Sequence, residues 1–298
     1  MRRVKQADPA LLYLEGLAPT GRRSMRSLLN HAARIVEIGE GVDDATWHKL
    51  NYQDVVTIQT RLRREGKAAS TINVTLTAIR SLLSVAVNVG LYDSDELHRI
   101  RSIKKIRGSA ALSGQALSRS QSNRLIKACR EDNTVVGVRD LAMLSLMLFA
   151  GLRRSEVTGL SVRDLDLRRR VLTIKGKGDK TRESYLQPRV VEWIKGWLHE
   201  RGREDEPLFV PVYSDCVVLR RLSSATVYDV VKRRCKEAGI GSVTPHDLRR
   251  TFATRLLEQG TDLAITSKLM GHSSVSTTTR YDHRNKKHQI QAMNSLMR

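Results

Sequence analysis

The chain has 298 residues, which is enough for two domains of ordinary size, and its 52 Lys and Arg residues outnumber its 31 Asp and Glu residues by 21. A basic surplus this large favours a polyanionic partner, above all a nucleic acid, over a small acidic substrate. The three cysteines are scattered without a Cys-x-x-Cys pair, and no GxxxxGK[ST] loop is present, so neither a zinc knuckle nor an ATP-driven motor is indicated.

Residues 1 to about 100 have the pattern of an all-helical region. The clearest helix opens at Ser70, which we expect as its N-cap, and runs to Val89, with Gly90 placed to end it. Its apolar residues recur at steps of three and four, which predicts one buried face. Residues 22–38 and 52–64 show weaker versions of this pattern. Their Arg, Lys, Ser, Thr and Asn residues suit phosphate contacts, or simply a solvated surface.

The helical periodicity stops after Arg101, and the following stretch is small, polar and basic, as a linker would be. We therefore expect an all-helical first domain at residues 1–105, a linker at residues 106–117, and a second domain at residues 118–298.

The second domain opens with Ser118, followed three residues later by Gln121, a pair that predicts a capping box at the start of a helix. An apolar helix over residues 137–150 should stop at Gly151. Residues 171–174 and 181–186 flank a glycine-rich turn, which predicts a β-hairpin with Lys177 at its tip.

Further helices fit residues 190–200, 224–238, 245–259 and 262–270. Thr244, Pro245 and Asp247 mark the start of the third of these as N-cap, N1 and N3 residues. The predicted fold is therefore mainly α, with a mixed α+β second domain that holds one small antiparallel sheet.

Neither a membrane span nor a signal peptide is indicated. The first residues are basic and lack a following apolar stretch, and the longest apolar run, from Leu141 to Ala150, is shorter than the roughly 20 residues that cross a bilayer. We expect a cytoplasmic protein.

Six residues suit the breaking and rejoining of a phosphodiester. A tyrosine phenolate can hold a phosphate and return it, because the phosphotyrosyl ester is close in energy to the bond it replaces. Arg and His donors would stabilise the charge on the non-bridging oxygens, and a mobile Lys or His would protonate the departing sugar oxygen. The candidates are Arg153, Lys177, His246, Arg249, His272 and Tyr281.

Each candidate also has an ordinary structural explanation. His246 and Arg249 stand three residues apart, so they share one helix face, but such a pair is common on surface helices. Arg153 and His272 suit charges at helix ends, Lys177 suits a turn, and Tyr281 suits a core position. The order and spacing of the six residues are a more specific indication of function than any one of them alone.

Together the motifs resemble the tyrosine recombinase family, which includes the phage integrases and the Xer recombinases. The matching segments are residues 151–157, 175–180, 246–254, 269–273 and 280–281. The successive intervals, from Arg153 to Lys177, from there to His246, then to His272 and finally to Tyr281, are 24, 69, 26 and 9 residues, as in the Xer-type pattern. Residues 70–83 resemble the family's core-binding helix, so the resemblance covers nearly the whole chain. Arg154 departs from the family, which often has an apolar residue there; the spacing from Gly151 favours Arg153 as the catalytic arginine.

The resemblance implies a SAM-like core-binding domain and a catalytic domain that together clamp double-stranded DNA. It implies that Tyr281 attacks the scissile phosphate and forms a 3′-phosphotyrosyl link. Arg153, Arg249 and His272 would stabilise the pentacoordinate phosphate, Lys177 would protonate the leaving oxygen, and His246 would assist proton transfer from the phenol. No cofactor and no metal is implied, because the ester stores the energy of the broken bond.

The resemblance also implies an assembly. Four protomers, either identical or paired with a related recombinase, would exchange strands between two DNA sites. A type IB topoisomerase, a telomere resolvase or a non-catalytic DNA-binding regulator stays open as an alternative, although a regulator should have lost Tyr281 or an arginine. Residues 287–298 carry an apolar stripe on a helix too short to be stable alone, so this tail should dock on its own domain or on the next protomer.

Overall fold

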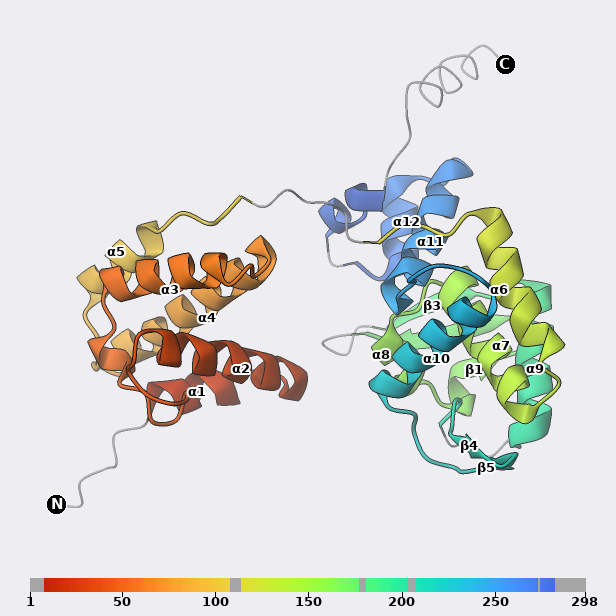
Figure 1. Cartoon of the computed structure of the whole chain (residues 1–298). Coiled ribbons are helices and arrows are strands. Elements are labelled where there is room, and N and C mark those ends of the chain that lie inside the picture. The colour runs from red at the N-terminus through yellow and green to blue at the C-terminus, as the bar shows by residue number, and fades with distance from the viewer. Residues whose placement is uncertain (1–7, 108–113, 177–180, 203–206, 273, 282–298) are drawn as a thin grey trace, which may run out of the picture. The chain divides into compact units, whose positions relative to one another are not determined.

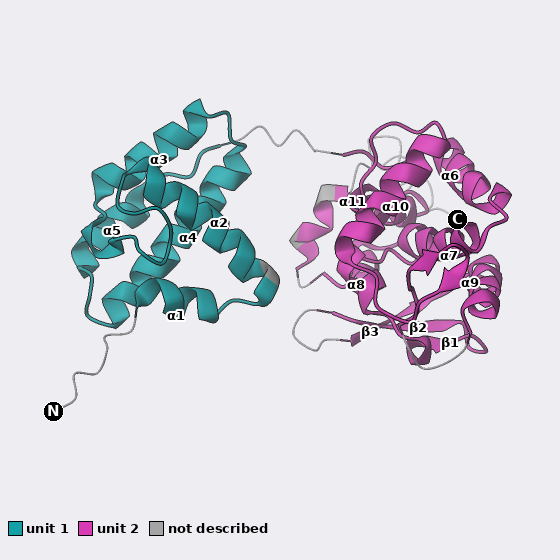
Figure 2. Cartoon of the chain, turned by 60° about the horizontal axis from the view of Figure 1, so that its bottom comes forward, with its two compact units in different colours: residues 1–111 teal, residues 112–298 magenta. Residues whose placement is uncertain are grey.

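The computed structural model describes residues 8–107, 114–176, 181–202, 207–272 and 274–281. The chain divides into two compact units, residues 1–111 and residues 112–298 (Figure 2). Each unit has its own apolar core, and each is described here by itself.

Unit 1 is all-helical, as predicted. Its elements are α1 (Pro9–Glu15), α2 (Pro19–Ile35), the 3-10 turn η1 (Trp47–Lys49), α3 (Tyr52–Arg64), α4 (Ala69–Asn88) and α5 (Ser94–Ser102). The helix α4 packs against all four other helices and contributes eight buried residues (Figure 1). By length and composition α4 is also apolar enough to cross a membrane, and its packing in this core accounts for that composition.

The predicted N-cap of α4 is wrong by two residues. Ala68 is the N-cap and makes no side-chain cap bond, so Ser70 lies inside the first turn. The predicted end is confirmed, because Gly90 follows the helix with a φ of +74°, a conformation that costs glycine little.

The two ends of the expected linker form hydrogen bonds with different units. Ile106 exchanges hydrogen bonds of 2.9 and 3.0 Å with the Asn73 side chain on α4, so this end belongs to unit 1. In unit 2 the Leu117 N–H donates to the Thr251 hydroxyl at 2.8 Å, and Arg250 donates to the carbonyl of Gly114. Residues 108–113 lie outside the described residues.

Unit 2 combines helices with two small antiparallel sheets, which confirms the predicted fold class. The helices are α6 (Arg119–Glu131), α7 (Val135–Phe149), α8 (Arg154–Gly159), α9 (Pro188–Arg201), α10 (Ser224–Glu237), α11 (Pro245–Glu258) and α12 (Leu263–Met270). The strands are β1 (Leu165–Asp166), β2 (Val171–Lys175) and β3 (Thr181–Tyr185) in one sheet, and β4 (Val212–Tyr213) and β5 (Cys216–Val217) in the other. Three 3-10 turns complete the described elements: η2 (Val162–Asp164), η3 (Val275–Thr277) and η4 (Thr279–Tyr281).

The helix α7 is buried along most of its length and packs against α6, α9 and α11 (Figure 1). It begins two residues earlier than predicted, because Thr134 is its N-cap and accepts from the Gly137 N–H. It stops before Gly151, as predicted. Gly151 has a φ of +64°, and a Cβ there would lie 2.3 Å from the Phe252 ring, so a side chain would disrupt the contact with α11.

The capping box predicted at Ser118 and the N-cap predicted at Thr244 are both confirmed. The hairpin is confirmed as well, since β2 pairs with β3 through the register Lys175↔Thr181. Lys177 lies outside the described residues. The sequence did not predict α8, β1 or the β4–β5 pair, whose two to six residues are too few to show a period.

Candidate active site

Tyr281 lies between two histidines that the sequence singled out. Its hydroxyl oxygen is 3.2 Å from Nε2 of His246, which stands in the first turn of α11. The ring of His272 stacks on the Tyr281 ring with a centroid distance of 6.1 Å and an interplanar angle of 25°. Only 4% of Tyr281 is exposed, and its ring packs with Ala253, Leu257 and Met270 in a small apolar cluster. The structure therefore brings three of the six predicted residues into contact.

A buried carboxylate, Glu156, holds three arginines around itself. Its oxygens accept from the Arg153 side chain at 2.6 Å and from Arg182 at 2.9 and 2.8 Å. Arg249 is 2% exposed, with its Nη1 atom 3.7 Å from Glu156. A buried charge is stable only when it is paired and hydrogen-bonded, and this cluster meets that condition for its three buried side chains, Glu156, Arg182 and Arg249.

The same arginines bind the end of α12. Arg182 donates to the carbonyl of Leu269 at 3.1 Å, Arg249 to that of Met270, and Arg153 to that of Gly271 at 3.0 Å. The last carbonyls of a helix lack partners within the helix and carry partial negative charge, so guanidinium groups stabilise them. His272 follows directly, and its position is therefore tied to Arg153 and Arg249.

The charges of this cluster shift the pKa of its members. Burial would raise the pKa of Glu156, but hydrogen bonds from Arg182 and Arg153 outweigh it and lower the pKa to about 2. Burial, and after it the neighbouring Arg153, lower the pKa of Arg249 below that of a free guanidinium. Glu156 thus stays ionised at physiological pH, and the cluster of this one carboxylate and three arginines has a net positive charge.

Both histidines are held neutral at physiological pH. Burial and the nearby Arg249 and Arg153 lower the pKa of His272 to about 4. Burial, Arg250 and Arg249 also lower the pKa of His246. A neutral imidazole has one nitrogen that donates and one that accepts. His272 uses its Nδ1 toward Thr278, whose hydroxyl oxygen is 2.8 Å away and whose side chain is fully buried.

The two neighbouring arginines have different surroundings. Arg153 is the N-cap residue of α8, and its side chain turns toward Glu156 and Gly271. Arg154 is exposed, with its guanidinium 6.0 Å from the centre of the Tyr228 ring on α10. The sequence-based choice of Arg153 thus falls on the arginine that belongs to the cluster.

Sequence reasoning missed Glu156, Arg182 and Thr278 as site residues. One signal was present for Arg182. Alternation along β3 puts residues 182, 184 and 186 on one face, and Leu186 marks that face as the buried one.

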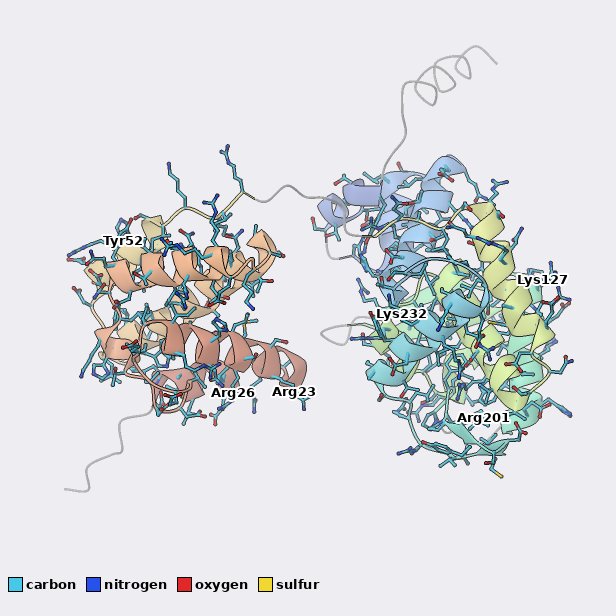
Figure 3. All side chains as sticks on the ribbon, in the orientation of Figure 1. Arg23, Arg26, Tyr52, Lys127, Arg201 and Lys232 are labelled. Carbon is cyan, nitrogen blue, oxygen red and sulfur yellow. The ribbon has the colours of Figure 1, made fainter. Side chains whose placement is uncertain are left out.

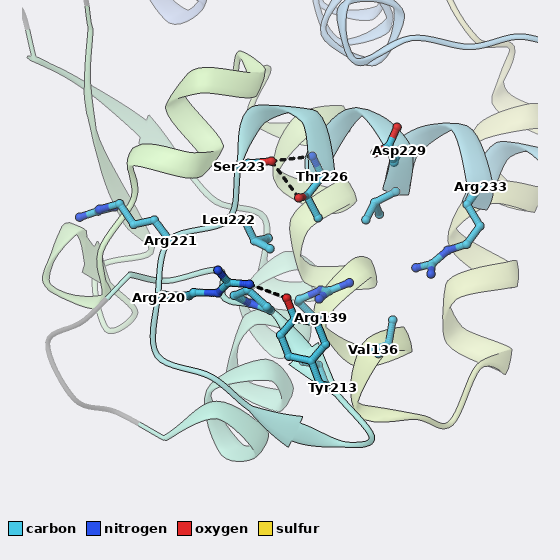
Figure 4. Close-up of a pocket in the computed structure, with 13 residues that line it drawn as sticks. Val136, Arg139, Tyr213, Arg220, Arg221, Leu222, Ser223, Thr226, Asp229 and Arg233 are labelled. Atoms are coloured by element: carbon cyan, nitrogen blue, oxygen red, sulfur yellow. Dashed lines mark hydrogen bonds between the residues drawn. The ribbon is translucent and has the colours of Figure 1, made fainter.

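A cavity of about 610 Å³ lies elsewhere in unit 2, between α7, β4 and the start of α10 (Figure 4). Its described lining includes four arginines but none of the six predicted site residues. Arg220 donates to the Tyr213 hydroxyl, and Arg221 donates to the carbonyls at the end of α8, among them that of Gly159 at 2.9 Å. Both of these arginines thus bind groups of the fold in their described bonds.

Comparison with known families agrees with this geometry. Residues 115–288 match the phage integrase family, and residues 11–90 match the phage integrase N-terminal SAM-like domain. The chain belongs to the phage integrase family. This confirms the resemblance drawn from the motifs, and it makes the chain a tyrosine recombinase.

Relatives in this family cover most of the chain. Tyrosine recombinase XerD of Oceanobacillus iheyensis is 34% identical over 248 residues, which are 80% of this chain and 80% of that protein. Tyrosine recombinase XerC of Yersinia pestis is 30% identical over 287 residues, 93% of this chain and 89% of that protein. The fold resembles the Tn1549 transposon integrase solved in complex with transposon right end DNA, with a TM-score of 0.74, 17% identity and coverage of 98% of this chain and 100% of that one.

Proposed function

We propose that this tyrosine recombinase cuts and rejoins double-stranded DNA at specific sites through a 3′-phosphotyrosyl intermediate on Tyr281. One observation supports the proposal most strongly. A tyrosine hydroxyl lies 3.2 Å from a histidine held neutral, beside a second histidine whose position is fixed by two buried or half-buried arginines.

In the first step, the Tyr281 oxygen attacks the scissile phosphorus while the bond to the 5′ oxygen breaks. His246 accepts the phenol proton, because its neutral Nε2 faces the hydroxyl. Since Tyr281 is almost fully buried, a local rearrangement on DNA binding must bring the phosphate to the phenol.

In the transition state, Arg153 and Arg249 stabilise the charge on the non-bridging oxygens. A guanidinium has five N–H donors, and the described bonds of Arg153 to Glu156 and Gly271 use only two of them. Donors fixed before the reaction need no reorganisation during it, which is the main source of such stabilisation.

His272 supplies a further donor. If the Thr278 hydroxyl donates to Nδ1, the neutral ring carries its proton on Nε2 and offers that N–H to the phosphate. In that arrangement the buried Thr278 hydroxyl holds the tautomer that the reaction needs.

Lys177 protonates the departing 5′ oxygen in this proposal. The described strands β2 and β3 end at Lys175 and Thr181, so Lys177 belongs to the connection between them. Lys177 lies outside the described residues, and its role rests on the family motif.

Both units contribute basic side chains toward a DNA partner. Figure 3 shows Arg23 on α2 of unit 1 and Lys232 on α10 of unit 2, and the chain as a whole carries a formal charge of +21. We infer that unit 1 binds the core site, that unit 2 carries the chemistry, and that the protein works in the cytoplasm. Four protomers, all of this chain or two of them a related recombinase, would exchange strands on two sites.

A two-site exchange assay tests this proposal. The purified protein is incubated with two labelled duplexes that carry its site, and with a supercoiled plasmid that carries one copy. We expect reciprocal products from the paired sites and a dependence on protein assembly. Relaxation of the single-site plasmid without any exchange would instead identify a topoisomerase.

A further inference from the structure

Arg182 is an arginine on the buried face of a β-hairpin. It stands second on β3, opposite Ile174 of β2, and its side chain is 11% exposed. Its neighbours Thr181 and Glu183 are exposed, while Ser184 on its own face is buried. Burying a guanidinium is costly unless every donor finds a partner, so this placement needs a reason.

Every kind of nitrogen in this guanidinium is bound. Nη1 and Nη2 donate to the two oxygens of Glu156 at 2.9 and 2.8 Å, and Nε donates to the carbonyl of Leu269 at 3.1 Å. Two parallel bonds fix the plane of the carboxylate as well as its position. A lysine cannot reproduce this geometry, because its ammonium group is a point charge.

The partners of Arg182 hold the proposed catalytic groups. Glu156 also binds Arg153 twice, through the Arg153 side chain at 2.6 Å and the Arg153 backbone N–H at 2.8 Å. Leu269 stands three residues before His272. At Gly271 between them, a Cβ would lie 2.8 Å from Nη1 of Arg182, so the end of α12 rests directly on this guanidinium.

We propose that Arg182 is a positioning residue for DNA strand cleavage. It orients Glu156, and through Glu156 it orients Arg153; it also fixes the end of α12, and through it His272. Because Arg182 stands on the strand that follows Lys177, and β3 packs against α12 (Figure 1), it also sets the hairpin against the phosphate-binding groups. This inference rests on the proposed function, since it assigns Arg182 a part in the same reaction.

The test uses the full chain with Arg182→Lys, which keeps the charge and removes the two parallel bonds. Arg201→Lys on α9 is the matched control, because Arg201 is also buried and donates to a carbonyl, that of Pro207, at 3.0 and 2.8 Å. We expect both variants to keep similar melting temperatures and similar affinity for the DNA site. Covalent adduct formation should slow about a hundredfold in Arg182→Lys, the scale of a displacement of about 1 Å in a catalytic group, and stay unchanged in the control.

Modified substrates show which groups Arg182 acts through. A methylphosphonate at the scissile position removes the charge that Arg153 stabilises, so the deficit of Arg182→Lys should shrink on it, as should that of Arg153→Ala. A sulfur in place of the 5′ oxygen replaces only the leaving group, so it should rescue Lys177→Ala and leave Arg182→Lys slow. In addition, Glu156→Gln combined with Arg182→Lys should be no slower than the slower single variant, because both changes break one network.

Several results would overturn the proposal. Wild-type cleavage rates in Arg182→Lys would do so, as would loss of folding or DNA binding in that variant, which would make Arg182 purely structural. A full deficit on the methylphosphonate, or multiplicative effects with Glu156→Gln, would contradict the route through Arg153. The wild-type adduct is measured first in each series. If it does not form on Tyr281, the proposed function fails, and that failure is distinct from a failure of the role of Arg182.

Discussion

At the scale of single residues, the site depends on which nitrogen faces which oxygen. The two neighbouring arginines give the sharpest comparison. Arg153 donates to Glu156 and to Gly271, whereas Arg154 lies over the Tyr228 ring. Arg153→Ala should therefore slow DNA cleavage about a hundredfold to a thousandfold, the cost of losing one preorganised donor, and Arg154→Ala should cost far less. Rates of adduct formation under single-turnover conditions measure this; equal losses would mean that the wrong arginine was assigned.

The neutral state of His272 makes stability depend on pH. Its pKa in the folded protein is about 4, below the ordinary value of 6.5, so between these values the unfolded chain binds a proton that the folded chain does not. The contribution of the neutral His272 to the free energy of unfolding is therefore complete above about pH 6.5, and it is lost as the pH falls toward 4. The urea midpoint should drop between pH 7 and pH 5, and the drop should be smaller in His272→Gln. An equal drop of the urea midpoint in the wild-type protein and in His272→Gln would show that other titrating groups cause it.

At the scale of elements, the connection between β2 and β3 contains Lys177, the general acid of the proposed function. If Lys177 protonates the departing oxygen, Lys177→Ala should cut ordinary DNA slowly, because the 5′ oxygen leaves as an alkoxide. A 5′-bridging sulfur leaves easily without a proton and should restore cleavage by this variant. A variant that stays slow on the sulfur substrate would exclude Lys177 as the general acid.

The elements that the sequence predicted are those with local signals. The start of α11 was predictable because Thr244 and Asp247 cap it from within four residues, and the end of α7 because Gly151 follows it. The pairing of His246 with Arg249 on one helix followed from spacing alone. Glu156 and Arg182 were not predicted as partners, because they are 26 residues apart, on α8 and β3, and only the tertiary fold brings these two elements together. The position of Thr278 against His272 likewise depends on two short 3-10 turns with no periodic pattern.

At the scale of the whole molecule, each of the two units has its own architecture. Unit 1 is a helical core around α4, and unit 2 places its six-residue helix α8, its hairpin and its last helices around one carboxylate. Residues 282–298 lie outside the described residues. From the apolar stripe in residues 287–298, we predict that this tail docks on the next protomer. Its deletion should leave folding and single-site binding nearly intact and abolish two-site synapsis, measured by gel shift with two duplexes.

Two outcomes would contradict that prediction. A truncated protein that still forms synapses would show that the tail is not needed between protomers. A truncated protein that fails to fold would show that the tail docks on its own domain.

The central claim is that Tyr281 becomes covalently linked to the DNA, and trapping of the covalent adduct tests it most directly. A nicked duplex that releases its 5′ strand after cleavage is incubated with the wild-type chain and with Tyr281→Phe, which lacks only the hydroxyl. We predict an adduct on the wild-type protein that peptide mapping assigns to Tyr281, and no adduct on Tyr281→Phe despite normal site binding. An adduct that persists in Tyr281→Phe, or one that maps to another residue, would contradict the account.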